Sequence, residues 1–170
     1  MMKKTIQILN KLCDEGIIKE YAIAGGMAQF YYIEPSVTYD LDLIVNIDTS
    51  ENDLSPLKDL YKWANDNNYK TESEHIVLGG IPVQFLLPYN PLVKEALQNK
   101  VKIELFNENT FILSAEYLMA LLLQTGRSTD KARLIKFLDE YEYNNIALID
   151  ILNRYELLEK FNDFKEKFYG

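Results

Sequence analysis

Along the first two thirds of the chain, the spacing of apolar residues switches repeatedly between a helical period and a strand-like one. Helical spacing, with apolar residues every three or four positions, covers residues 3–15, 27–33, 54–68 and 91–99. Short apolar or alternating runs cover residues 21–24, 39–47, 75–78, 81–89, 101–106 and 110–113. Strands and helices that alternate in this way predict a small mixed sheet with flanking helices.

A tight hairpin is predicted at the centre of this region. Gly79 and Gly80 separate two strand-like runs, and two consecutive residues that tolerate positive φ favour a two-residue turn. Pro82 has no N–H for a strand ladder, so it is expected at a strand start or on an edge. The two runs should therefore pair as neighbouring strands.

From residue 114 onward the apolar pattern is helical only. Ser114 and either Ser128 or Thr129 are candidate N-caps, because a hydroxyl side chain accepts a hydrogen bond from the first N–H groups of a helix. The chain has no repeat, low-complexity tract or long Pro/Gly/Ser linker. We therefore predict an α+β fold, with a sheet-containing domain over residues 1–113 and a helical part packed on it over residues 114–170.

Composition narrows the classes of function. The 170 residues carry a formal net charge of −8, which argues against broad binding to DNA, since such binding relies on Lys and Arg neutralising phosphates. No run approaches the roughly 18 consecutive apolar residues of a membrane span, so no membrane association is expected. Cys13 is the only cysteine. It is expected to be a small buried hydrophobe, and its isolation fits a reducing compartment, most simply the cytoplasm.

The stretch "AIAGGMAQFYYIEPSVTYDLDLIV", residues 22–45, carries the strongest candidate chemistry. Gly25 and Gly26 lie between a predicted strand and a predicted helix, and a helix N-terminus is a phosphate site. Asp40 and Asp42 are two residues apart on a predicted strand, so both carboxylates face the same side. Paired carboxylates repel unless a cation joins them, and their oxygens suit Mg²⁺ or Mn²⁺. Each motif alone is more often a plain turn or a solvated strand end; together they indicate a site for a metal-bound nucleoside triphosphate.

The combination resembles the signature of the nucleotidyltransferase superfamily of the DNA polymerase beta type. In that signature a hydrophobic residue and Gly-Gly or Gly-Ser precede a spacer and Asp-h-Asp-h, where h is hydrophobic. Here it reads AGG at 24–26, thirteen residues, then DLDL at 40–43. Thr38 looks like the threonine of the "T-x-D-h-D" form common in bacterial members. The segment "YLMALLLQTGRSTDKARL" is similar to the "GR-x-x-D" region of small bacterial proteins related to abortive-infection nucleotidyltransferase toxins.

The resemblance implies a nucleotidyltransferase-like fold and a set of functional residues. Gly25, Gly26 and Thr38 would bind the nucleoside triphosphate. Asp40 and Asp42 would ligate Mg²⁺ or Mn²⁺ and would be the catalytic carboxylates. Nucleotide binding and metal binding are thus expected at one site.

The third carboxylate of the family is replaced in this chain. It normally comes from a later strand, helps to bind a second metal ion and activates the incoming hydroxyl. The matching position is Gln84, which carries no charge and accepts no proton. Losing a general base typically lowers a rate by about 10²–10⁴-fold. Glu104 could stand in if its strand lay beside that of Asp40, although its alternation with apolar residues favours a solvent-facing position. A lysine that some relatives carry is also absent, with Leu122 or Leu123 in its place.

Two other polar residues have competing interpretations. Arg127 precedes a predicted helix and could clamp a phosphate beside the helix N-terminus. An ion pair with a nearby acid, or a cap on the preceding helix, is the alternative of equal standing. His75, the lone histidine, begins a predicted strand and is expected to have a surface or packing role.

Two hypotheses from different classes follow. The first is an enzyme that moves a nucleotide from a nucleoside triphosphate onto a hydroxyl of RNA, a protein or a small molecule. The second is a non-catalytic module of the same fold that binds nucleotide or a partner protein in a toxin–antitoxin or phage-defence setting, with a cognate antitoxin as partner. Gln84 favours the second hypothesis, and the intact pair Asp40 and Asp42 favours the first.

Overall fold

The computed structural model describes residues 1–34, 38–49 and 52–170, and within them the chain forms one mixed sheet of seven strands. The strands are β1 (Glu20–Ile23), β2 (Leu41–Asn46), β3 (Thr71–Glu72), β4 (His75–Leu78), β5 (Ile81–Leu86), β6 (Val101–Leu105) and β7 (Glu108–Ile112). Their order across the sheet is β3-β4-β5-β2-β1-β7-β6. The central strand β2 is antiparallel to β1 and parallel to β5, and β1 pairs in parallel with β7.

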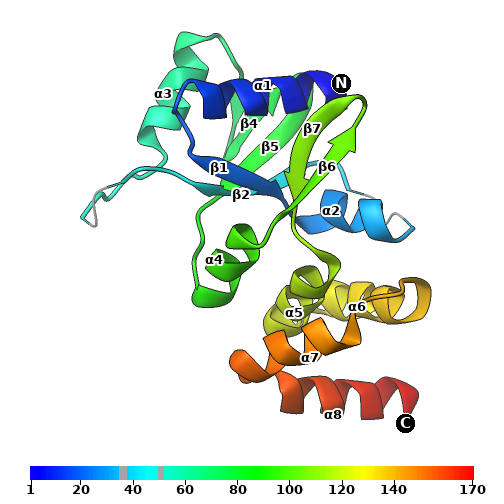
Figure 1. Ribbon diagram of the computed structural model, residues 1–170. Helices are drawn as coiled ribbons and strands as arrows, with labels where there is room; N and C mark the ends of the chain where they lie inside the picture. Colours follow the sequence, from blue (N-terminus) through cyan, green and yellow to red (C-terminus); the bar gives the residue numbers. More distant parts are fainter. Residues whose placement is uncertain (35–37, 50–51) are drawn as a thin grey trace.

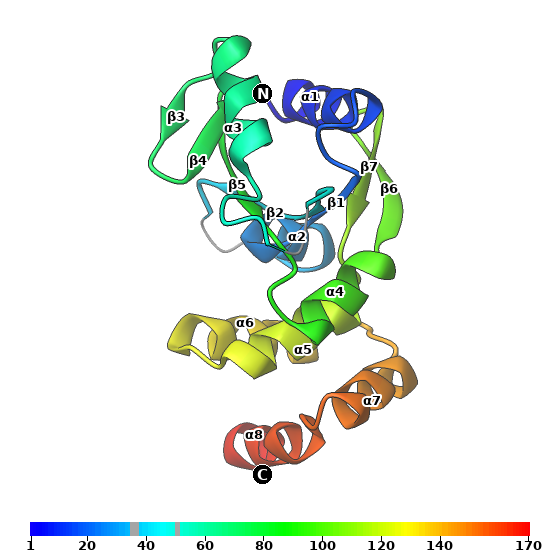
Figure 2. The same ribbon diagram turned by 90° about the vertical axis from the view of Figure 1, so that its left-hand side faces the viewer.

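Helices cover both sides of this sheet. They are α1 (Met2–Asp14), α2 (Gly25–Tyr32), α3 (Lys58–Asp66), α4 (Pro91–Gln98), α5 (Ala115–Thr125), α6 (Ser128–Glu140), α7 (Asn145–Arg154) and α8 (Leu158–Tyr169). Figure 1 shows α1 and α3 above the sheet and α5 to α8 below it, with α2 and α4 between the sheet and α5. In Figure 2, α7 and α8 lie on the side of α5 and α6 away from the sheet. The predicted α+β class is confirmed, while the domain division after residue 113 stays a prediction.

The hairpin predicted around two glycines is confirmed. Gly79 and Gly80 have φ angles of +60° and +88°, and Leu78 pairs with Ile81 across them. Pro82 is the second residue of β5 and precedes the first pairing of β5 with β2, at Val83. A missing N–H there removes no bond from the central ladder.

Two predicted elements begin later along the chain than expected. The strand expected at 39–47 begins at Leu41, so Asp40 lies just before it. The helix expected at 54–68 is limited to α3, because the N–H of Ser55 donates to Oδ1 of Asp53 at 2.9 Å and forms a turn. Leu54 consequently lies in solvent, 99% exposed.

The end of α1 carries the cysteine of the chain and a contact that joins α1 to α3. Cys13 is half-buried, and burial is the main cause that raises the pKa of its thiol to about 11. The raised pKa disfavours the thiolate, which is the reactive form, although the side chain is less buried than expected. Nε1 of Trp63, from α3, donates to Oε2 of Glu15 at 2.9 Å.

Among the described residues, no helix is both long enough and apolar enough to cross a membrane.

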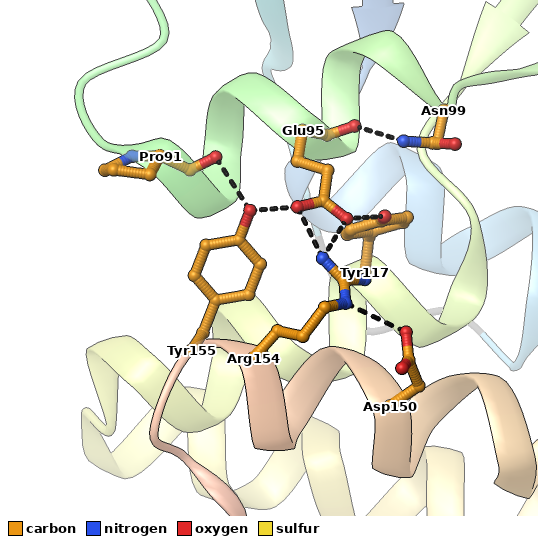
Figure 3. A network of polar contacts seen from close by, with 7 residues as sticks. All are labelled: Pro91, Glu95, Asn99, Tyr117, Asp150, Arg154 and Tyr155. Atoms are coloured by element: carbon orange, nitrogen blue, oxygen red, sulfur yellow. Dashed lines mark hydrogen bonds and ion pairs between the residues drawn. The ribbon is translucent and has the colours of Figure 1, made fainter.

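A carboxylate on α4 joins the sheet-containing part to the C-terminal helices (Figure 3). Nη1 of Arg154 donates to both carboxylate oxygens of Glu95, at 2.5 and 2.7 Å. The hydroxyl of Tyr117 donates to the same carboxylate at 2.7 Å, and the hydroxyl of Tyr155 does so as well. Nε of Arg154 also donates to Asp150 at 2.9 Å. One charged network thus holds α4, α5 and α7 together.

We expect Glu95→Gln to lower the free energy of unfolding by about 1–2 kcal/mol at pH 7, the low end for bonds to a charged group because the network is partly solvated. Burial of the Glu95 carboxylate acts to raise its pKa, but hydrogen bonds from Tyr155, Tyr117 and Arg154 outweigh burial and lower the pKa below the ordinary glutamate value. This contribution is present above the ordinary pKa of glutamate and is lost as the pH falls through the lowered value. Urea unfolding between pH 7 and about pH 3 should therefore show the two proteins converging.

Asp150→Asn is the matched control for that experiment. It removes an ion pair from the same arginine, Arg154, but the Asp150 side chain is 64% exposed, so a change below about 0.5 kcal/mol is expected. Equal effects of the Asp150 and Glu95 substitutions would show that the network around Glu95 adds no stability beyond an exposed pair.

Candidate functional site

Gly25 and Asp42, one from each sequence motif, are in direct contact. Gly25 begins α2 with a φ of +57°, and a Cβ placed on it would lie 2.1 Å from Oδ2 of Asp42. The backbones are joined as well, because the N–H of Ala24 donates to the carbonyl oxygen of Asp42 at 2.9 Å. The left-handed backbone and the close approach both require glycine at this position.

The N-terminus of α2 offers free N–H groups beside that carboxylate. Ala24 is the N-cap residue and has no side-chain acceptor, and no side chain among the described residues caps this end. The first intrahelical bond comes from the N–H of Ala28. Uncapped N–H groups and the positive end of the helix dipole favour an anion here. A Cβ on Gly26 would lie 2.9 Å from Cβ of Thr38, so Thr38 packs against the same turn.

Asp40 is held by side chains from two directions. Oγ1 of Thr38 donates to Oδ1 of Asp40 at 3.2 Å, and Nε2 of His75 lies 3.6 Å from Oδ2 of Asp40. Thr38 therefore orients a carboxylate, a role that the sequence motif does not specify. The hairpin thus brings the His75 ring to Asp40, a contact not expected from the sequence pattern, and the surface or packing role expected for His75 stays a prediction.

Asp42, Gln84 and His75 form a row across three neighbouring strands. Asp42 pairs with Gln84 in the parallel ladder of β2 and β5, and Gln84 pairs with His75 in the antiparallel ladder of β4 and β5. Directly paired residues project to the same face of a sheet. Gln84 thus lies beside Asp42, where the sequence signature places a third carboxylate.

Neither Glu104 nor the position expected for the missing lysine places a charge in the site. Glu104 is exposed on β6, which is an edge strand, and β1 and β7 separate it from β2. Its predicted solvent-facing position is confirmed, and it cannot stand in for Gln84. Leu122 and Leu123 are buried on α5, at 7% and 3% exposure.

The electrostatics of the site centre on Asp42. Burial is the main cause that raises the pKa of Asp42, and the neighbouring Asp40 raises it further. His75, Arg133 and Arg127 act in the opposite direction and lower it. A partly buried carboxylate beside a second one is stabilised in its charged form by a bound cation.

A cleft of about 150 Å³ lies at this point, between the sheet and the C-terminal helices. Gly25 and Asp42 line it from the sheet side, and Arg127 and Arg133 line it from the side of α6. Most other lining residues are apolar, and Tyr89, which is 64% exposed, completes it. Arg133 and Tyr89 had no signal in the sequence, because packing of distant segments brings them here.

Arg127 forms an ion pair with a nearby acid, which was the alternative to phosphate binding. Its side chain also lines the cleft. Its Nε donates to Oδ2 of Asp130 at 2.8 Å, and its backbone N–H donates to the same oxygen at 3.2 Å. Arg127 is therefore the N-cap residue of α6, and the caps expected at Ser128 or Thr129 are wrong. Asp130, only 1% exposed, satisfies that helix end instead.

The carboxylate pair fits a hard divalent cation that arrives with its own ligands. Among the described residues, no group of three or more His, Cys, Asp or Glu side chains is placed to hold a metal ion. Mg²⁺ typically takes one or two carboxylates and completes its shell with water and phosphate oxygens. Asp40 and Asp42, beside the uncapped start of α2, match that requirement for a cation bound together with a phosphate.

A solved structure with the same architecture gives the fold a class. The antigenic nucleotidyltransferase-like protein from Paracoccidioides brasiliensis superimposes with a TM-score of 0.67 and 15% sequence identity, over 96% of this chain and 86% of that one. No protein-family model and no curated protein sequence matches this chain. At such identity the similarity shows the fold alone, which is nucleotidyltransferase-like. The fold implied by the sequence signature is thereby confirmed, and the relation to abortive-infection toxins stays a prediction.

Asp42→Asn is expected to raise the melting temperature by about 1–3 °C in metal-free buffer at pH 7, since partial exposure keeps the effect below about 1 kcal/mol. Because the pKa of Asp42 is raised, the folded protein binds this proton more tightly than the unfolded chain does. The stability of the wild type therefore falls as the pH rises from the ordinary aspartate range through the raised pKa.

The advantage of the Asn variant should shrink on acidification, and thermal melts between pH 7 and about pH 4 measure it. Asp48→Asn, at an exposed aspartate paired with Lys19, is the control and should not raise the melting temperature. A lower melting temperature of Asp42→Asn at pH 7 would contradict the electrostatic cost assigned to Asp42.

Proposed function

We propose that this protein binds a nucleoside triphosphate as its Mg²⁺ or Mn²⁺ complex and transfers the nucleotide to a hydroxyl of an acceptor. The observation that carries the proposal is the contact of Gly25 with Asp42, which sets an uncapped helix N-terminus beside a carboxylate of raised pKa. An anion site and a cation site that touch are suited to a phosphate chain with its metal. The nucleotidyltransferase-like fold supports this assignment.

The residues that line the cleft, together with Asp40 beside it, have distinct parts in the proposed reaction. The N–H groups at the start of α2 would bind the phosphates, and Asp40 and Asp42 would hold the cation. Arg133 and Arg127, across the cleft, would offset the remaining negative charge. When bound, the metal would neutralise phosphate charge and polarise the reacting phosphorus. The volume of about 150 Å³ lies below the roughly 300–1,000 Å³ of typical ligand sites, so part of the nucleotide would extend beyond it.

Transfer requires a proton acceptor that Gln84 does not provide. The acceptor oxygen would bond to the α-phosphorus, the bond from that phosphorus to its bridging oxygen would break, and pyrophosphate would leave. The proton of the attacking hydroxyl must pass to a base, and an amide cannot take it. His75 follows Gln84 in the row across the sheet and can accept a proton, which supports retained activity.

A binding module is the second candidate function. Gln84, beside Asp42, weakens a second metal position more than it weakens nucleotide binding. In this case the protein would hold nucleotide or a partner protein without turnover. A toxin–antitoxin or phage-defence setting in the bacterial cytoplasm, with a cognate antitoxin, is the context that the sequence resemblance suggests.

Label transfer from α-³²P nucleoside triphosphates distinguishes these functions. With Mg²⁺ or Mn²⁺, the wild type is expected to label RNA or itself, and Asp40→Ala/Asp42→Ala is expected to give no label. Thermal melts with metal and nucleotide run in parallel, since a ligand that binds only the folded state raises its melting temperature. A metal-dependent shift without label favours a nucleotide-binding module, and neither shift nor label contradicts both nucleotide transfer and nucleotide binding.

Gln84→Glu sharpens the same assay. It returns a carboxylate to the position beside Asp42 and is expected to raise labelling by up to about 10²–10⁴-fold, the usual worth of a general base. Gln84→Met, of similar size and without charge, is the matched control. No gain with Glu would mean that His75 or another group already supplies the base.

Gly25→Ala is expected to remove the metal-dependent nucleotide shift, because the new Cβ must displace the Asp42 carboxylate. Gly16→Ala is the matched control: Gly16 also has a positive φ, +72°, but no atom lies within 4 Å of its added Cβ. Both variants should lose about 1–2 kcal/mol to the left-handed backbone, and only Gly25→Ala should lose nucleotide binding. Retained binding in Gly25→Ala would contradict a site built on this contact.

A further inference from the structure

One residue that lines the cleft, Gln29, has a buried polar atom without a partner among the described residues. Gln29 lies one turn into α2 and is 4% exposed, and its Oε1 receives no hydrogen bond within the part of the chain that the structure describes. Buried side-chain oxygens are nearly always hydrogen-bonded. An unpartnered amide in the lining of a ligand cleft therefore indicates a contact made by a bound molecule.

The surroundings of Gln29 give no structural reason for an amide. The cleft that it lines is otherwise mostly apolar on this side, with Ile44 of β2 and Leu118 and Leu122 of α5. An apolar side chain would pack among these residues without the penalty of a buried, unbonded oxygen. Ligand sites, in contrast, are typically apolar pockets with a few polar groups that fix orientation.

The position along α2 indicates which part of a nucleotide this amide would meet. Gln29 follows Gly25 by four residues, which is about 6 Å along a helix axis. A phosphate at the N-terminus of α2 would thus place the sugar, the next group of the nucleotide, near Gln29, whereas the amino groups of a base lie farther away. The terminal torsion of a glutamine is broad and soft, so rotation about it can turn the oxygen toward the cleft.

We propose that Gln29 accepts a hydrogen bond from a ribose hydroxyl of the bound nucleotide and thereby selects ribonucleotides over deoxyribonucleotides. The inference rests on the proposed nucleotide site and assigns its sugar specificity. Gln29 would be a binding residue that takes no part in the bond changes at phosphorus. A site that loses this donor leaves a buried oxygen unpaired, which is why such contacts discriminate strongly between substrates.

Calorimetric titration with Mg²⁺ and ATP, 2′-deoxy-ATP or 3′-deoxy-ATP tests the inference. For the wild type, we expect Kd to be roughly tenfold higher for one of the deoxy analogues than for ATP, the worth of a hydrogen bond whose loss leaves a buried group unpaired. Gln29→Met, of similar size, should bring that ratio close to one. Gln29→Glu keeps an acceptor oxygen and should keep the ratio, even if its charge weakens the binding of every nucleotide.

Two controls separate sugar recognition from folding. Gln98→Met, at an exposed glutamine of α4, should leave the ratio at the wild-type value. Without nucleotide, Gln29→Met should melt at the same temperature as the wild type or higher, because an isosteric apolar group replaces an unpaired amide. A clear loss of stability in Gln29→Met would mean that the amide has an internal partner and would overturn the inference.

The remaining outcomes distinguish this inference from the proposed function. Metal-dependent binding of ATP and both deoxy analogues with equal Kd overturns the role of Gln29 and leaves the nucleotide site intact. A Gln29-dependent preference for ATP over inosine triphosphate, without a sugar preference, overturns the ribose assignment in favour of a base contact. Absence of binding by any nucleotide overturns the inference and the proposed function together.

Discussion

The approach of the Gly25 backbone to the Asp42 carboxylate is the contact on which the candidate site depends. Because glycine has no Cβ, the backbone at the start of α2 lies closer to the Asp42 side chain than any other residue at position 25 would allow. The two sides of the site come from α2 and β2, so regular secondary structure fixes their geometry. The cost is a left-handed backbone and a carboxylate whose burial raises its pKa. Under the proposed function, a bound cation would offset the charge of that carboxylate, and a phosphate would meet the positive end of the helix dipole.

Two carboxylates of this chain show opposite uses of the same group. Glu95 accepts hydrogen bonds from an arginine and two tyrosines, and these bonds lower its pKa. Asp42 is partly buried and has a second carboxylate for a neighbour, and its pKa is raised for both reasons. The first is fully satisfied by the protein and holds helices together. The second has no such set of donors among the described residues, and under the proposed function its charge would be met by a bound cation.

Much of the fold follows from local rules, and the site follows from them only in part. Gly79 and Gly80 define a two-residue turn, and that turn alone sets residue 84 opposite residue 75, so the position of His75 could have been read from the hairpin register. At the start of α6, the sequence offers the hydroxyls of Ser128 and Thr129 and the carboxylate of Asp130. The Asp130 carboxylate prevails because it accepts hydrogen bonds from both the backbone N–H and the guanidinium of Arg127. Arg133 reaches the cleft through packing of α6 on α5, which no period in the sequence encodes.

The register between β2 and β5 also has a consequence for how such a protein changes over generations. Gln84 is locked beside Asp42 by the pairing of the two strands, so any residue that replaces it inherits the same place. Glutamine and glutamate codons differ by one base. The chain is therefore a single nucleotide substitution away from three acidic side chains in one site, and the reverse step is equally short. Lineages with this backbone can gain or lose an acidic group at that position without rebuilding the sheet.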